Sequence, residues 1–242
     1  GYDVRKMCQR LRPSAGGGGV GAWGYLSATT WLRLRGPLSV SGKRYESRRD
    51  PGNAMTVKPD TCRGCPLYQT GWGFVPDEVV EGSDVFILAQ NPGADEEIQG
   101  KPMVGKVGQE EMRSFFPPAG LTRGKVSLGN VLRCRLGNTN NMPTGSSLTE
   151  ATKHCSQYLH IPTSTKLIVA EGRYAWQFLG GTGSIKLWRG FLSPKRYGGK
   201  PVLGVLHGGD VVAREKKLYF PSQMDWRKID RYLKGEWPRT VP

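Results

Sequence analysis

The chain has 242 residues and a formal net charge of +15 at pH 7, from 35 Lys and Arg residues against 20 Asp and Glu residues. This length suffices for one well-packed domain with an extension. Such a basic excess favours a polyanionic partner, most often nucleic acid, because Lys and Arg displace the counterions of a phosphate backbone. The alternative is a solvated, highly charged surface. No apolar run of about eighteen residues is present, so the sequence predicts no membrane contact through a spanning helix.

Residues 1–54 differ in composition from the rest of the chain. They are basic, contain the run GGGG at 16–19 and have no sustained periodicity. This composition is typical of a flexible basic extension. Met55 lies directly before TVKPDTCRGCPL and is a candidate start of the folded part. The sequence therefore predicts an N-terminal extension over 1–54 and one domain over 55–242.

Short apolar runs alternate with helix-like segments after residue 84. The runs are too short and too continuous for surface strands, so each predicts a strand buried on both faces of a parallel sheet: 84–91, 125–132, 166–172 and 201–207. The helix-like segments are 108–116, 148–159, 171–180 and 225–237. Thr149 is a candidate N-cap for the second of them. The alternation predicts an α/β fold, a three-layer α/β/α domain with a central, mainly parallel four-stranded sheet.

Polar residues follow the predicted strands. Sheets of this kind place their chemistry just beyond the carboxyl ends of the strands. Those ends carry Gln90 and Asn91, then Asn130, then Glu171, and finally His207. Amide and imidazole groups from separate segments are therefore expected at one edge of the sheet.

The chain has five cysteines, an odd number that includes one Cys-x-x-Cys pair. Without a signal peptide, this pattern favours metal ligation over disulfides. Four thiolates would suit a [4Fe–4S] cluster or a structural zinc ion. The candidate ligands are Cys62, Cys65, Cys134 and Cys155. Cys8 lies in the extension and is expected to be free.

Several spaced motifs together resemble the iron–sulfur branch of the uracil-DNA glycosylase superfamily, often called family 4. The motifs cover roughly residues 60–220 and occur in the order CRGCPL, AQNPGADEEIQGKPMVGKVGQ, LGNVLRCR, HCSQYL, IVAEGRYAWQFL, LWRG and VLGVLH. The resemblance implies that Cys62, Cys65, Cys134 and Cys155 bind a structural [4Fe–4S] cluster. Zinc remains the alternative.

The resemblance also implies the roles of the polar residues. His207 would stabilise the negative charge on the departing base, and Asn91 would position the attacking water. Glu96 matches the downstream acidic residue, which would orient water or balance the developing sugar cation. The implied base-binding residues are Gln90, Gly93, Met103 and Asn130.

Three departures from the family 4 pattern affect the expected substrate. Asn91 stands where family 4 has glutamate and is similar to the Asn-Pro-Gly loops of other branches. Met103 replaces the phenylalanine that stacks on uracil, and methionine is flexible enough to pack on a larger base. The sequence His207-Gly208-Gly209 replaces His-Pro-Ser, with Val211 or Val212 as the candidate wedge into DNA. These changes favour an enlarged pyrimidine over plain uracil.

Basic residues near these motifs are expected to contact phosphates, which positions the DNA without reading its sequence. They are Arg189, Lys195, Arg196, Arg214, Lys216 and Lys217, and each of them has the alternative of being a solvated surface charge.

The sequence thus predicts a monofunctional DNA glycosylase that acts on DNA as a monomer in the prokaryotic cytoplasm. The preferred substrate is an enlarged base, such as the hydroxymethylated or glucosylated cytosine of bacteriophage DNA, which would imply antiviral defence. Two alternatives stay open. One is a uracil-DNA glycosylase of base excision repair, and the other is an inactive iron–sulfur DNA-binding module.

Overall fold

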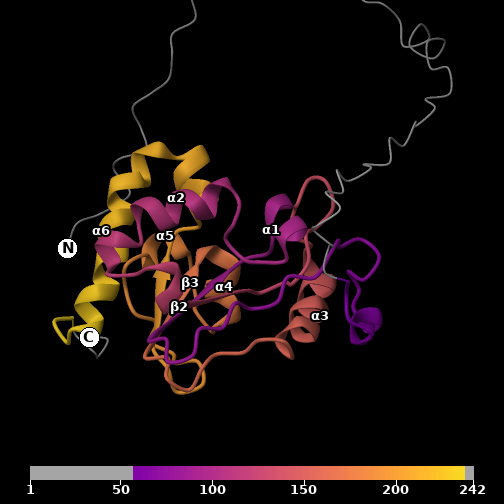
Figure 1. Cartoon of the computed structure of the whole chain (residues 1–242), viewed down its shortest axis with the longest axis horizontal. Coiled ribbons are helices and arrows are strands. Elements are labelled where there is room, and N and C mark those ends of the chain that lie inside the picture. The colour runs from indigo at the N-terminus through magenta and orange to yellow at the C-terminus, as the bar shows by residue number, and fades with distance from the viewer. Residues whose placement is uncertain (1–56, 238–242) are drawn as a thin grey trace, which may run out of the picture. The chain divides into compact units, whose positions relative to one another are not determined.

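The computed structural model of the chain describes residues 57–237, and the predicted extension over 1–54 lies outside them. One sheet of four strands, in the order β2-β1-β3-β4, forms the centre of the domain. In Figure 1, β2 and β3 lie among the helices in the middle of the molecule. Every pairing in it is parallel. The strands are β1 (Val85–Ala89), β2 (Val126–Asn130), β3 (Leu167–Glu171) and β4 (Val202–Val205). The four predicted strands and the α/β class are confirmed.

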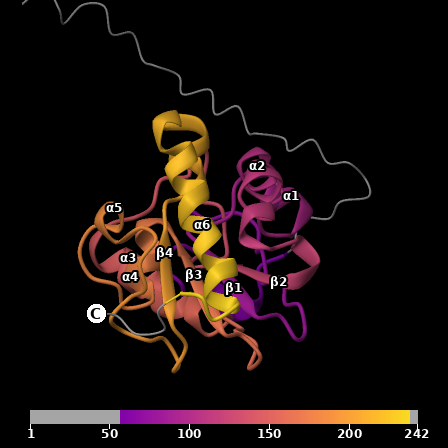
Figure 2. The same ribbon diagram turned by 90° about the vertical axis from the view of Figure 1, so that its left-hand side faces the viewer.

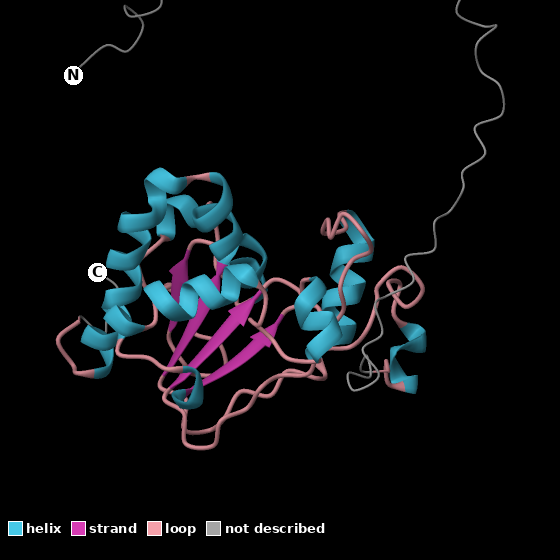
Figure 3. Ribbon diagram, turned by 45° about the horizontal axis from the view of Figure 1, so that its top comes forward, coloured by secondary structure: helices cyan, strands magenta, loops and turns pink. Residues whose placement is uncertain are grey.

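Helices cover both faces of the sheet. In Figure 2, α6 crosses one face while α3 and α4 lie behind the strands, and Figure 3 shows the strands running between the helical layers. The α-helices are α1 (Ala94–Gln99), α2 (Lys106–Ser114), α3 (Gly145–Ser156), α4 (Gly172–Phe178), α5 (Ile185–Trp188) and α6 (Tyr219–Leu233). Short 3-10 turns are η3 (Asp60–Gly64), η4 (Pro117–Ala119), η5 (Arg123–Lys125) and η7 (Lys216–Leu218), and η6 (Gly209–Arg214) is a π-helical turn. Among the described residues, no helix is long and apolar enough to cross a bilayer.

Two predicted helices begin three or more residues earlier than expected. Helix α6 begins at Tyr219, six residues before the predicted start at 225, and it ends at Leu233. Helix α3 begins at Gly145, directly after its N-cap Thr144. Thr149 is therefore inside the helix, where its hydroxyl donates to the carbonyl of Gly145, and it is not the N-cap. Helix α1 was not predicted, because its sequence ADEEIQ is polar and only Glu97 in it is buried. Apolar periodicity cannot reveal such a helix.

Aromatic side chains fill the core on both faces of the sheet. On the face covered by α6, Trp226 stacks on Phe115 and lies tilted against Phe116, with ring centroids 6.1 and 5.5 Å apart. Trp176 of α4 is fully buried on the other side. The strands between these layers are buried along nearly their whole length, which matches their continuous apolar sequences.

A buried ion pair ties the loops at the β2 end together. The side chains of Arg133 and Asp77 are 1% and 3% exposed and lie 2.8 Å apart. The Arg133 guanidinium also donates to the carbonyls of Asn130 and of Tyr158, which follows α3. The Asp77 carboxylate accepts the backbone N–H of His160. One guanidinium therefore joins the end of β2 to the segment that follows α3.

The chain changes direction within the sheet between β1 and β3. After β1 it adds β2 on one side, and it then returns to add β3 on the other. A crevice opens at such a switch point, outside the carboxyl ends of the strands. In this domain the two strands on either side of that point end at Ala89 and Glu171. The fold therefore places the residues that follow them at the edge where a ligand can enter.

Asp77→Ala is expected to lower the free energy of unfolding by about 3–5 kcal/mol, because it leaves the buried Arg133 without its carboxylate. The control is Asp84→Ala, which removes an ion pair at the surface. The side chain of Lys166 in that pair is 64% exposed and that of Asp84 is 43% exposed. That change should cost no more than about 1 kcal/mol. Urea unfolding of both variants measures the difference, and equal losses would contradict the role given to the buried pair.

Candidate functional site

A cavity of about 1000 Å³ lies at the carboxyl ends of the strands. Loops that follow all four strands contribute to its wall, as the parallel arrangement requires. Its lining includes the predicted catalytic and base-binding residues, namely Gln90, Asn91, Gly93, Glu96, Met103, Asn130 and His207. The structure thus brings these residues together around one space.

His207 follows β4 and is held by its own turn. The backbone N–H of Gly209 donates to His207 Nδ1 at 3.0 Å. In a neutral imidazole only one ring nitrogen carries a hydrogen, so this contact assigns that hydrogen to Nε2. The ring therefore has one N–H donor left for a group inside the cavity.

Gly172 gives His207 its place beside β3. Its φ of +83° lies in the left-handed region, which glycine adopts at little cost. A Cβ atom there would stand 2.8 Å from the Cβ atom of His207. A larger residue at this position would therefore displace the imidazole as well as strain the backbone.

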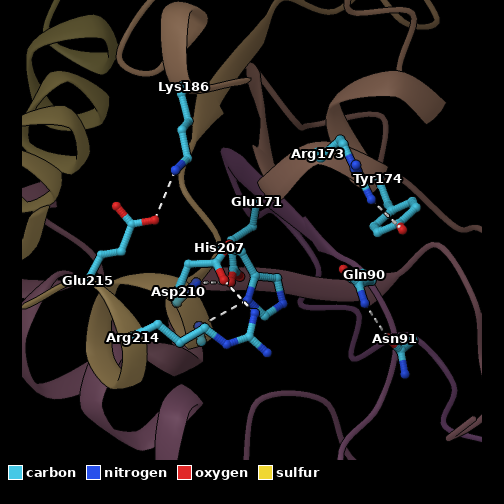
Figure 4. A network of polar contacts seen from close by, with 12 residues as sticks. Gln90, Asn91, Glu171, Arg173, Tyr174, Lys186, His207, Asp210, Arg214 and Glu215 are labelled. Carbon is cyan, nitrogen blue, oxygen red and sulfur yellow. Dashed lines mark hydrogen bonds and ion pairs between the residues drawn. The ribbon is translucent and has the colours of Figure 1, made fainter. Parts of the chain in front are cut away.

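Asn91 is oriented by a residue from the loop between the third and fourth candidate ligand cysteines. Its Nδ2 donates to Asn140 Oδ1 at 2.6 Å and to the carbonyl of Pro92 at 3.1 Å. Asn140 is held in turn, because its Oδ1 accepts the N–H of Leu136 and its Nδ2 donates to Pro92. Gln90 Nε2 donates to Asn91 Oδ1 at 3.0 Å, as Figure 4 shows. The amide nitrogen of Asn91 is thus committed, and its oxygen keeps a further acceptor site.

Glu96 joins two segments of the cavity wall. Its Oε2 accepts the N–H of Gly93 at 3.0 Å, and its Oε1 accepts the N–H of Gly105 at 2.7 Å. The same carboxylate caps the first turn of α1, where negative charge favours the helix dipole. Glu96 therefore fixes the two loops that carry Gly93 and Met103.

Met103 and Asn130 line the cavity although little of either is exposed, 7% and 4% respectively. Met103 has a φ of +55°, which is uncommon for a residue with a side chain. Its carbonyl accepts from the Arg123 guanidinium at 3.2 Å, which helps to hold this turn. Asn130 is the last residue of β2, so a rigid strand positions its amide.

The predicted phosphate contacts differ in their placement. Arg214 lines the cavity and is exposed, although its guanidinium pairs with Asp210 at 2.8 Å. Lys216 is exposed in η7 and does not line the cavity. Arg189 pairs with the buried Asp225, which belongs to α6. Arg189 is thus committed to an internal contact.

Val211 is fully buried in the core, so the expectation that it inserts into DNA does not fit this structure. It packs with the core cluster, and Val212 is the partly buried neighbour. The sequence alone could not separate the two, because the turn that contains them is π-helical and follows neither strand nor α-helix periodicity.

Other polar groups at the rim were not predicted. Arg173 lies over the Tyr174 ring, 4.5 Å from its centroid, and Lys186 pairs with Glu215 at 2.9 Å. Figure 4 shows these groups around His207. All four line the cavity. Arg173 and Tyr174 directly follow Gly172, and Lys186 directly precedes the LWRG motif. These sequence positions were the only indication that the three residues belong to the site.

Two carboxyl groups that the sequence did not assign, Glu111 and Glu171, also lie at the cavity wall. They are 1% and 2% exposed. Burial, then the carboxyl of Glu171, then that of Glu96 raise the pKa of Glu111 well above its ordinary value. Glu171 was visible as a strand-end residue, whereas Glu111 lies on a helix whose sequence gave no sign of a buried acid.

The four candidate ligand cysteines are buried, free of disulfides and located around one small cavity. Burial raises the pKa of Cys134 to about 12, and the other three thiols are close enough to affect it by charge. A Cβ at Gly71 would lie 2.4 Å from the Cys134 sulfur, so the backbone packs directly on this group. In donor type and burial the set suits a thiolate-bound centre.

The thiols line one cavity without closing around a single point. Within residues 57–237, no group of three or more His, Cys, Asp or Glu side chains could hold a metal ion as it stands. A single zinc ion needs sulfur atoms at about 2.3 Å from one centre. The arrangement therefore identifies a common location for the ligands and leaves the bound group to be inferred.

The family model of the Uracil DNA glycosylase superfamily matches residues 76–228, more than half of the chain. The chain belongs to this superfamily. The match begins next to Asp77 and ends within α6, so it contains the whole sheet and the cavity. The suspected family and the three-layer fold are thereby confirmed.

Curated members of the superfamily with similar sequences are type-4 uracil-DNA glycosylases. The protein of Thermotoga maritima is 30% identical over 197 residues, which cover 78% of this chain and 98% of that protein. The protein of Archaeoglobus fulgidus is 34% identical over 122 residues, 49% of this chain and 58% of that protein. The protein of Sulfurisphaera tokodaii is 28% identical over 119 residues, 49% of this chain and 53% of that protein. The chain spans little more than half the length of these last two relatives.

Asn140→Ala is expected to lower the free energy of unfolding by about 1–3 kcal/mol, because it removes the hydrogen bonds to Asn91, Leu136 and Pro92. The matched control is Asn141→Ala, since Asn141 is the exposed neighbour. Its effect should stay within about 0.5 kcal/mol. Denaturant unfolding measures both, and an Asn140 variant as stable as the control would contradict the orienting role.

Proposed function

We propose that this protein is a monofunctional DNA glycosylase, which hydrolyses the N-glycosidic bond of a flipped-out pyrimidine and leaves an abasic site. The observation that carries the proposal is the His207 turn, which leaves Nε2–H as a donor in the cavity that Asn91 and Asn130 also line. Membership of the superfamily supports the same activity. DNA is the partner, and the protein acts as a monomer in the prokaryotic cytoplasm.

The reaction requires a donor for the leaving base. A base within a duplex is out of reach, so it must be extruded into the cavity. As the bond to the sugar breaks, negative charge develops on the base oxygen and positive charge on the sugar. His207 Nε2–H donates to that oxygen, and its turn holds the ring in place beforehand, which is where such stabilisation is most effective.

Asn91 and Asn130 have separate roles in the proposed reaction. Asn140 holds the amide nitrogen of Asn91, so the Asn91 oxygen accepts a hydrogen bond from the attacking water. The amide of Asn130 offers one donor group and one acceptor, which pair with a pyrimidine edge. Glu96 has both oxygens on backbone N–H groups, so it acts through its negative charge near the sugar cation and by fixing the loops.

An enlarged pyrimidine, such as hydroxymethylated or glucosylated cytosine, is the preferred substrate of the proposed enzyme. Three features of the cavity support this choice: its volume of about 1000 Å³, the small Gly93 and the adaptable Met103. Removal of such bases from bacteriophage DNA would serve antiviral defence. Uracil is the alternative, and the names of the type-4 relatives favour it.

A [4Fe–4S] cluster held by Cys62, Cys65, Cys134 and Cys155 is the proposed cofactor. Each thiolate of such a cluster binds its own iron, so the ligands surround a group wider than one ion. This suits four thiols that line a common cavity without meeting at one point. When bound, such a cluster would brace the loop between Cys134 and Cys155, which carries Asn140. Zinc is the alternative.

The proposal is tested by base release from uracil-containing oligonucleotides and from phage DNA with unmodified, hydroxymethylated or glucosylated cytosine, scored as alkali-labile sites. Release from modified cytosine alone supports the enlarged-base substrate. Release from uracil alone identifies a repair enzyme. DNA binding without any release identifies the inactive module.

His207→Ala is expected to lower the rate of base release by about 10²–10³-fold, the usual effect of removing one donor to a developing oxyanion. Asn91→Ala should also lower the rate, with little change in DNA affinity. His160→Ala is the control, because His160 is exposed and lies outside the cavity lining. Single-turnover kinetics measure all three, and an unchanged rate in the His207 variant would refute the assigned donor.

Cys134→Ser is expected to abolish the broad visible absorption of an iron–sulfur cluster and to lower the thermal midpoint of the purified protein. A protein that contains iron and sulfide and loses both in this variant holds the cluster, whereas a colourless protein that contains zinc does not. Cys8→Ser is the matched control, since Cys8 is outside the proposed ligand set, and it should keep the absorption of the wild type.

A further inference from the structure

The turn that carries His207 rests on two acids from other elements. The backbone N–H of Gly208 donates to Glu171 Oε1 at 2.8 Å, at the end of β3. A Cβ atom at Gly208 would stand 2.0 Å from Glu111 Oε1, so the carboxyl of α2 touches the backbone of the same turn. Figure 4 shows Glu171 directly beside His207. Only a glycine fits between these groups.

The pair lacks donors for two of its oxygens. Glu111 Oε1 and Glu171 Oε2 are buried and have no hydrogen-bond partner among the described residues. Neither side chain takes part in an ion pair in that part of the chain. Both carboxyl groups contact Gly208. Two carboxylates cannot satisfy each other, whereas a carboxyl and a carboxylate can, because one proton supplies the missing donor.

The charges around the pair also favour a bound proton. Glu96 of α1 adds negative charge, and His207 is the titratable group of the turn itself. On η6, Arg214 is neutralised by Asp210 at 2.8 Å. On the outer face of α2, Glu110 is engaged by Tyr219, Ser114 and Arg113. Burial and the neighbouring carboxyl groups accordingly raise the pKa of Glu111.

We propose that Glu111 and Glu171 share one proton beneath the cavity, and that this pair holds the turn of His207, Gly208 and Gly209 in its working position. Glu171 is a positioning residue that acts through the Gly208 N–H, and Glu111 keeps Glu171 in place. The effect on base release rests on the function proposed above, whereas the shared proton does not depend on it.

Loss of the proton should release the turn. With both groups ionised, two buried negative charges repel each other and neither receives a hydrogen bond from the other. The Glu171 carboxylate then moves from Gly208, and the donor of His207 moves with the backbone. The alkaline limb of the activity profile would therefore report the pair.

The shared proton is tested without activity, by unfolding of the full chain as a function of pH. Below the ordinary glutamate pKa of about 4.3, folded and unfolded chains both carry the proton and the stability is fully present. Above it only the folded chain keeps the proton. The unfolding equilibrium constant of the wild type then rises by as much as about tenfold per pH unit until the folded chain also loses it.

Glu111→Gln has no proton to lose at this position, so its unfolding constant should rise less steeply with pH than that of the wild type. The rise that remains comes from other buried carboxyl groups, such as Asp77, whose pKa burial raises to about 6. Glu110→Gln is the matched control on the same helix. Hydrogen bonds from Tyr219 and Ser114 lower the pKa of Glu110, so its own contribution lies at lower pH and the control should keep the wild-type rise. Equal pH dependence of the wild type and Glu111→Gln would overturn the proposal.

The positioning role is tested by the pH profile of base release. Glu111→Gln should remain active at higher pH than the wild type, because its amide donates at every pH. Glu171→Gln retains an acceptor for Gly208 and should stay close to the wild-type maximum, whereas Glu171→Leu should fall at least tenfold below it. Coinciding profiles for Glu111→Gln and the wild type would overturn this role. If neither the wild type nor any variant releases a base, the proposed function fails. The unfolding data then still decide whether the proton is shared.

Discussion

The arrangement of the site depends first on the buried ion pair of Arg133 and Asp77. The Arg133 guanidinium donates to the carbonyls of Asn130 and of Tyr158, which follows α3. In the sequence, Arg133 immediately precedes Cys134. A buried pair of this kind adds little net stability compared with apolar packing, but the loss of either partner leaves an uncompensated charge in the interior. The pair therefore holds the end of β2 and the segment after α3 in one relative position.

Backbone groups and glycines orient the polar side chains around the cavity. Gly209 N–H selects the hydrogen position on His207, and Gly172 leaves room for that ring beside β3. Glu96 uses both oxygens on backbone N–H groups of two loops. Such contacts fix direction before any ligand arrives, so less free energy is lost to reorganisation when charge develops. The polar groups that line the cavity are therefore held in fixed orientations, as a preorganised site requires.

The family match and the shape of the cavity depend on different parts of the molecule. The match covers the sheet and the strand ends, where the geometry is set by parallel pairing. The size of the cavity depends on the loops that carry Gly93, Met103 and Asn140, which line it. Their contacts run between segments far apart in the sequence, and small changes in them alter the cavity without disturbing the sheet. A common fold is thus compatible with a different base.

The sequence by itself determined the four strands, because continuous apolar runs bounded by polar turns have few other solutions, and it determined the strand-end residues, because parallel strands end at one edge. It also grouped the four cysteines that line one small cavity in the structure. Only the tertiary structure decided that Val211 is buried, that Asn140 orients Asn91, and that Glu111 and Glu171 both contact Gly208. These contacts join residues whose separation along the chain carries no local pattern, so they exist only once the layers have packed.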